Sequence, residues 1–227
     1  NGQYSGLTPL PAGMTAVIDG ENNGTIIVGA DSVGVYGKNG ARLSNKGSIT
    51  TGSNSAALMS SGTNSSVVNS GEITVGENSQ GIYLKDGADT ENKSSGNINS
   101  MAGNAVGIFA DNVTSSVKNN GTIIMLGNKS VGIYSEGINA QTIINNGEIK
   151  VGDSTAENDP SIGIMSENVG DQITNNGTVT SGANSIGIYS EGGNVQQNGI
   201  LNIGNSGIGI YIENGNLTAG NTAVFNF

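Results

Sequence analysis

Carboxylates are the side chains of this chain that could do chemistry. The 227 residues include 18 aspartates and glutamates, 8 lysines and arginines, and neither cysteine nor histidine. The lack of these two residue types excludes thiolate nucleophiles, disulfides and zinc sites, and we predict no metal and no cofactor. The net charge of −10 disfavours nucleic acid, whose phosphates would be repelled. Acid–base catalysis and the binding of basic partners remain.

Four glutamates recur at one position of a repeated motif. Glu136, Glu167, Glu191 and Glu213 each lie two residues after a tyrosine or a methionine. In a stack of repeats their carboxylates would lie about one strand spacing apart, and they would repel one another unless a cation or a basic partner neutralised them. They are therefore candidate partner-binding residues. Screening of the charge by solvent is the alternative.

A second group of carboxylates lies in an insertion. Asp153, Glu157 and Asp159 fall within the stretch 153–160, which lengthens one repeat. Loops that protrude from repeats often bind partners, so these three residues are further candidates. Their spacing does not match an EF-hand, and a solvated acidic bulge is the alternative.

Catalysis by these carboxylates is not predicted. Enzymes that cleave polysaccharides need clustered carboxylates, usually with a basic residue nearby. Arg42 is the only arginine, and the lysines are scattered along the sequence. We assign no catalytic residue, and a carbohydrate-active enzyme stays the alternative to a binding protein.

The positions of the carboxylates follow from eight copies of one motif. Each copy has a small polar residue two places before a glycine, then an aliphatic residue, and ends in Gly-aliphatic-aromatic or a close variant. A period of roughly 25 residues indicates a solenoid. The anchor glycines are Gly24, Gly47, Gly71, Gly96, Gly121, Gly147, Gly177 and Gly199.

The strands of each repeat can be predicted from the apolar pattern. Isoleucine and valine dominate, and they alternate with polar residues in three short segments of each copy, as in Ile73 and Val75. The 38 glycines and many asparagines indicate tight turns with left-handed backbone conformations. We predict an all-β, right-handed parallel β-helix of eight to nine rungs, with three strands per rung. It should occupy residues 17–227, after an irregular segment or partial rung at 1–16.

Asparagine recurs two places before most anchor glycines, in phase with an inward aliphatic residue. Stacked amides at one turn can hydrogen-bond along the rod, so we predict a structural ladder. Ser94 and Gln197 interrupt the pattern, and Asn92 replaces an aliphatic residue, which predicts weak packing in the fourth rung. The predicted ladder residues are Asn22, Asn45, Asn69, Asn119, Asn145 and Asn175.

An aromatic or methionine residue should form an outward column on the second strand. Such a column could dock a sugar or a protein, and the candidates are Tyr134, Tyr189 and Tyr211. The alternative is a stacking ladder that only stabilises the rod. The whole column comprises Tyr36, Met59, Tyr83, Phe109, Tyr134, Met165, Tyr189 and Tyr211.

The repeated Asn-x-Gly-x-Ile followed by Gly-Ile-Tyr, in an acidic chain without cysteine, resembles the passenger region of the large fusobacterial autotransporter adhesins of type Va secretion. The resemblance covers residues 17–212. It implies export, anchoring through a C-terminal outer-membrane barrel, and display on the bacterial cell surface. It implies adherence to host cells and coaggregation as functions, with a host receptor, a glycan or a bacterial surface protein as partner.

Two further expectations concern assembly. No apolar run is long enough to span a bilayer, so we expect no direct membrane insertion by these residues. Strand edges at the two ends of the repeat region would allow end-to-end self-association. Besides the adhesin and the enzyme, a passive stalk spacer is the third functional hypothesis.

Overall fold

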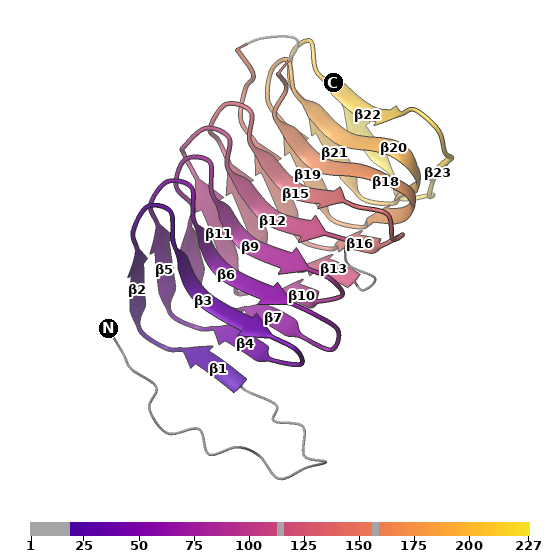
Figure 1. The fold of residues 1–227 in the computed structure, drawn as a ribbon. Helices are drawn as coiled ribbons and strands as arrows, with labels where there is room; N and C mark the ends of the chain where they lie inside the picture. Colours follow the sequence, from indigo (N-terminus) through magenta and orange to yellow (C-terminus); the bar gives the residue numbers. More distant parts are fainter. Residues whose placement is uncertain (1–18, 113–115, 156–158) are drawn as a thin grey trace, which may run out of the picture.

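The computed structural model describes residues 19–112, 116–155 and 159–227, and these form a right-handed parallel β-helix without any helical segment. Figure 1 shows the rungs stacked along one axis from the N-terminal to the C-terminal end of the rod. A rung begins at a first-face strand, so there are eight rungs, and a last strand begins a ninth. The predicted fold class is confirmed. The predicted segment 1–16 lies outside the described residues.

Three faces build each rung. The first face holds β2 (Thr25–Val28), β5 (Ser48–Thr51), β8 (Glu72–Thr74), β11 (Asn97–Ser100), β14 (Thr122–Met125), β17 (Glu148–Val151), β19 (Thr178–Ser181), β21 (Ile200–Ile203) and β24 (Val224–Asn226). The second face holds β3 (Val33–Lys38), β6 (Ala56–Ser61), β9 (Gln80–Lys85), β12 (Val106–Asp111), β15 (Val131–Glu136), β18 (Ile162–Asn175), β20 (Ile186–Gln197) and β22 (Ile208–Ile212). The third face holds β1 (Asp19–Asn22), β4 (Arg42–Asn45), β7 (Ser66–Asn69), β10 (Asp89–Asn92), β13 (Ser116–Asn119), β16 (Thr142–Asn145) and β23 (Leu217–Ala219).

The sixth and seventh rungs depart from the predicted three separate strands. In each of them the second and third strands run on as one strand, β18 with 14 residues and β20 with 12. The pairing of β18 with β20 shifts register on both sides of Val169, so the corner between the two faces is a β-bulge. This bulge replaces the turn that separates the second and third faces in the other rungs.

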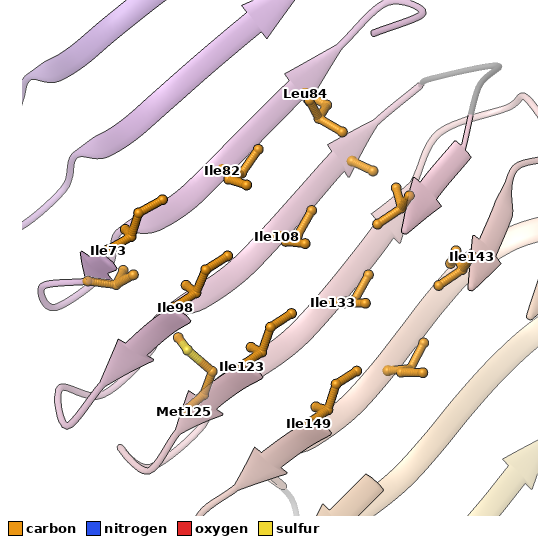
Figure 2. Close-up of a cluster of buried hydrophobic side chains, with 14 of the residues drawn as sticks. Ile73, Ile82, Leu84, Ile98, Ile108, Ile123, Met125, Ile133, Ile143 and Ile149 are labelled. Carbon is orange, nitrogen blue, oxygen red and sulfur yellow. The ribbon is translucent and has the colours of Figure 1, made fainter. Parts of the chain in front are cut away.

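The core consists of columns of aliphatic side chains, one from each rung. In Figure 2, Ile73, Ile98, Ile123 and Ile149 lie in one line along the first face. Ile82, Ile108 and Ile133 form a second line along the second face, and all seven side chains are fully buried. Parallel, in-register pairing puts each aliphatic residue directly on its counterpart, so a thin core becomes continuous.

The second face differs from the predicted strict alternation. In β12, Gly107 and Ile108 are both buried, whereas Val106 is only half-buried. A Cβ added at Gly107 would lie 2.7 Å from Cγ2 of Ile123 and 2.6 Å from the carbonyl oxygen of Gly132. Glycine therefore lets the second strand approach the first face at this point. Among the first aliphatic residues of the predicted pairs, Val33 and Ile208 are exposed and Val106, Val131 and Ile186 are half-buried, whereas Ala56 and Ile162 are buried.

The anchor glycines after Gly24 serve close approach between rungs, and none of the anchor glycines has a positive φ angle. A Cβ at Gly147 would lie 2.0 Å from the carbonyl oxygen of Gly121 in the rung before. Positive φ angles are found instead at other turn residues, among them Asn54, Asn104 and Gly137. The repeat of the glycine thus reflects the space between neighbouring backbones.

The amide ladder is continuous from β1, which precedes the first rung, through the seventh rung. Each side-chain Nδ2 donates to the side-chain oxygen of the next rung at 2.8–2.9 Å, as between Asn119 and Asn145, and the last acceptor is Gln197. All six predicted members are present. We call this set the amide ladder: Asn22, Asn45, Asn69, Asn92, Asn119, Asn145, Asn175 and Gln197.

The predicted weak fourth rung is wrong, because Asn92 takes the ladder position that Ser94 was expected to hold. Asn92 is fully buried and bonds to Asn69 and Asn119. The register moves the aliphatic position to Thr90, which pairs with Val67 and Val117. The turn after β10 is longer instead, so the packed interior is preserved.

Candidate functional site

The aromatic column lies at the outer edge of the second face, as predicted. Its members pair with one another from rung to rung through the whole face. The ring centroids of Tyr83 and Phe109 are 5.1 Å apart, those of Phe109 and Tyr134 5.0 Å, and those of Tyr189 and Tyr211 5.6 Å, and the planes of each pair are nearly parallel. Stacked rings cover each other's faces, so the column presents mainly ring edges.

The tyrosine hydroxyls connect this column to the residues two positions further along. In the first three rungs these residues are Lys38, Ser61 and Lys85, and in the next five they are acids, which we call the acidic column: Asp111, Glu136, Glu167, Glu191 and Glu213. The hydroxyl of Tyr83 donates to Asp111 at 2.9 Å, and that of Tyr189 to Glu213 at 2.8 Å, each in the following rung. The link repeats in the first rung, where the Tyr36 hydroxyl lies 3.0 Å from the Ser61 hydroxyl.

Tyr134 lies between two carboxylates. Its hydroxyl oxygen is 2.7 Å from Oε2 of Glu136 in its own rung and 2.7 Å from Oε2 of Glu167 in the next. Its single proton can bond to one carboxylate at a time. Burial, followed by the neighbouring carboxylates of Glu167 and Glu136, raises the pKa of Tyr134 well above its usual value. The structure thus brings together three residues that the sequence predicted as separate binding candidates.

The four candidate glutamates have no basic partner among the described residues. The ion pairs found there are Lys46–Glu21, Lys85–Asp111, Lys93–Glu91 and Lys129–Asp159. Glu167, Glu191 and Glu213 are exposed, and within the described chain the Glu191 carboxylate makes no hydrogen bond. Among the described residues, tyrosine hydroxyls are the only side-chain partners of Glu136, Glu167 and Glu213. The negative charge of the four glutamates has no counter-charge there.

Tyrosine ionisation should report on this arrangement. Burial, followed by the hydrogen bond to Glu213, raises the pKa of Tyr189 to about 12, against 10.0 for a free tyrosine. The unfolded chain therefore loses this proton first as pH rises, so the stability that Tyr189 contributes declines between those two values. We expect absorbance titration to show late ionisation, and Glu213→Gln to lower the pKa of Tyr189. A titration that Glu213→Gln leaves unchanged would contradict the hydrogen bond.

Two carboxylates of the insertion 153–160 bond to residues of neighbouring rungs. Oδ1 of Asp153 accepts a hydrogen bond of 2.8 Å from the backbone N–H of Ala183. Oδ2 of Asp159 lies 2.7 Å from Nζ of Lys129, a partner that sequence proximity did not reveal. Glu157 lies outside the described residues. The two described carboxylates thus have structural roles at the base of the loop.

A groove on the third face contains a combination of residues that the sequence analysis missed. Asp89 and Glu91 project from β10 into a groove of about 230 Å³, and Lys118 of β13 pairs in register with Glu91. Only the register of the pairing between β10 and β13 reveals this combination, because Glu91 and Lys118 lie one rung apart. The pKa of Glu91 is lowered, chiefly by the hydrogen bond from Lys93. Asp89 accepts a hydrogen bond of 2.8 Å from the backbone N–H of Ser116.

Metal and membrane features are limited in the described part of the chain. It contains no group of three aspartate, glutamate, histidine or cysteine side chains that could hold a metal ion. It also contains no helix that could cross a bilayer.

One comparison with known proteins is informative. The model of the family described as the BigA third pectate lyase-like domain matches residues 16–226. No curated protein and no solved structure matches the chain. The match extends over all described rungs, so the chain belongs to the family of the BigA third pectate lyase-like domain.

Proposed function

We propose that this domain is a segment of a bacterial surface adhesin and that its acidic column binds a basic protein surface on a host cell or on another bacterium. The observation that carries the proposal is the row of Glu136, Glu167, Glu191 and Glu213 without a basic partner among the described residues. Lysine or arginine side chains of a partner would relieve the repulsion along this row, and complementary charge speeds association. Display on the cell surface is part of the proposal and is supported by the family.

A protein partner is favoured over a glycan by the aromatic column. Sugars stack on the faces of aromatic rings, and in this column a neighbouring ring covers both faces of Phe109 and one face each of Tyr83, Tyr134, Tyr189 and Tyr211. Tyr36 is 52% exposed and Tyr211, whose ring stacks on that of Tyr189, is 44% exposed, so a sugar would have most access at these two rings. A glycan receptor is therefore an outcome that the binding test must include.

We also propose that the domain is not an enzyme. A general acid needs a carboxyl group whose pKa is raised toward neutrality. In the groove of the third face, Lys93 lowers the pKa of Glu91, and Asp89 accepts a hydrogen bond from the backbone. These contacts support a role of both carboxylates in holding the turn and the strand.

Neutralising the four glutamates of the acidic column should weaken binding to cells. The change is Glu136, Glu167, Glu191 and Glu213 to glutamine together. We expect at least about tenfold weaker binding to epithelial cells, immune cells or partner bacteria, because several unpaired charges contribute to one contact. Binding of the unchanged protein should also weaken with salt. The measurement is flow cytometry with the labelled domain at two salt concentrations.

A matched control removes the same charge elsewhere. Glu21, Glu72, Glu77 and Glu148 are exposed glutamates away from the acidic column, and their replacement by glutamine should leave binding intact. Equal loss in both variants would indicate a general charge effect and contradict the proposal. No binding by the unchanged protein would support the passive spacer, and inhibition by free sugars alone would support the glycan. End-to-end self-association stays a separate prediction.

A further inference from the structure

A single carboxylate lies inside the rod at the β-bulge of β18. Asp171 is fully buried, and its Oδ2 accepts hydrogen bonds of 2.7 Å from the hydroxyls of Ser135 and Ser166. Its Oδ1 accepts a third, also 2.7 Å, from the backbone N–H of Gln141. Three donors to one carboxyl group are what an ionised carboxylate requires. The charge is thus held in the interior by neutral groups.

Two residues that bond to this cluster each carry a side-chain oxygen without a donor. Oδ1 of Asn168 and Oε1 of Gln141 are buried and have no hydrogen-bond partner in the described structure, while Nδ2 of Asn168 donates to the Ser135 hydroxyl at 2.8 Å. The other end of the Gln141 amide, Nε2, lies 3.5 Å from the carbonyl oxygen of Ala110 in the fourth rung. Rotating the Asn168 amide would not help, because Ser135 already gives its only proton to Asp171 and can only accept from Asn168. The oxygen of Asn168 must therefore be the atom without a donor.

The electrostatic balance points in the same direction. A buried carboxylate without a counter-charge is costly, and buried oxygens without donors add to that cost. None of the ion pairs of the described chain involves Asp171. One negative charge surrounded by hydroxyl and amide oxygens suits a hard cation of charge +1, whereas the multi-carboxylate group that divalent ions prefer is absent from the described residues.

We infer that the rod encloses a monovalent alkali cation, such as sodium, at Asp171, with the side-chain oxygens of Asn168 and Gln141 as further ligands. The ion supplies the missing positive charge and occupies the two oxygens that lack donors. It also links the fifth and sixth rungs, since Gln141 and Ser135 belong to one and Asn168 and Asp171 to the other. The site lies at the bulge, where regular pairing is broken and a further link stabilises the corner.

The test compares thermal unfolding in sodium chloride and in choline chloride of equal ionic strength. Because a ligand that binds only the folded state stabilises it, we expect the midpoint of the intact domain to be at least about 3 °C higher in sodium. Asp171→Asn should remove this difference. Glu191→Gln, which removes an exposed carboxylate, should retain it.

Equal midpoints of the unchanged protein in the two salts would overturn the inference, as would a sodium effect that survives in Asp171→Asn. If Asp171→Asn does not fold, crystals of the unchanged domain soaked in thallium(I) decide the question. An anomalous peak between Asp171, Asn168 and Gln141 would support the ion. Its absence, or an ordered water there in place of the ion, would exclude it.

Discussion

Replacing Gly147 by alanine is expected to lower the free energy of unfolding by about 3 kcal/mol or more. A Cβ there would lie 2.0 Å from the carbonyl oxygen of Gly121 and 2.9 Å from its nitrogen. Both are backbone atoms held by the pairing of β14 with β17, so they cannot move without separating two rungs. The measurement is urea unfolding followed by circular dichroism.

The chain contains a matched control for this change. Gly24 holds the same place in the motif, but a Cβ added to it would meet nothing within 4 Å. Gly24→Ala should therefore change the free energy of unfolding by less than about 0.5 kcal/mol. If both variants lost the same stability, backbone freedom of glycine would be the cause and the close approach between rungs would not.

Asn145→Ala is the second substitution with a large expected effect, about 3 kcal/mol of lost stability. The side chain accepts a hydrogen bond from Asn119 and donates one to Asn175, both at 2.8 Å and fully buried. Alanine would leave the Asn175 oxygen without its donor and would open a small cavity. The effect should appear in the same urea unfolding measurement.

The neighbouring residue provides the comparison for this prediction. Asn146 also bonds to the equivalent amides before and after it, Asn120 at 2.8 Å and Asn176 at 2.9 Å, but its ladder is exposed. Because water can replace these hydrogen bonds, Asn146→Ala should cost less than about 1 kcal/mol. Similar losses in both variants would mean that burial does not determine the strength of the amide ladder.

The features that sequence could predict are those that depend on period alone. Alternation within strands and the repeat of roughly 25 residues were enough for the three faces, the aromatic column and six members of the amide ladder. These properties persist if the length of one turn is misjudged, because the pattern in the other rungs is unchanged. The structure confirms them for the rungs that it describes.

The features that sequence could not predict depend on exact neighbours in adjacent rungs. Asn92 entered the ladder because its turn is two residues longer than the others, which only the register reveals. The role of the anchor glycines is set by a backbone in another rung, and so is the contact of Tyr134 with Glu167. The bulge at Val169 also needed coordinates, since nothing in the repeat marks the fusion of two strands.

At the candidate site, too, the sequence predicted which residues recur but not which of them contact each other. The sequence grouped the glutamates and the tyrosines into two columns, but it treated the columns as independent. In the structure the tyrosine hydroxyls bond to the acids, as Tyr189 does to Glu213. The two sets of binding candidates thus form one hydrogen-bonded edge. Its four glutamates have no basic partner among the described residues.

The amide ladder also bears on how genes for such rods can change. Each asparagine of the ladder accepts from the rung before and donates to the rung after, as Asn119 and Asn145 do. A duplicated rung would therefore find a complementary neighbour on both sides, and a deleted one would leave two rungs that fit each other. Unequal recombination between repeats could lengthen or shorten the rod in steps of about 4.8 Å per rung without a new fold. Reach from the cell could then evolve separately from the chemistry of the side surface.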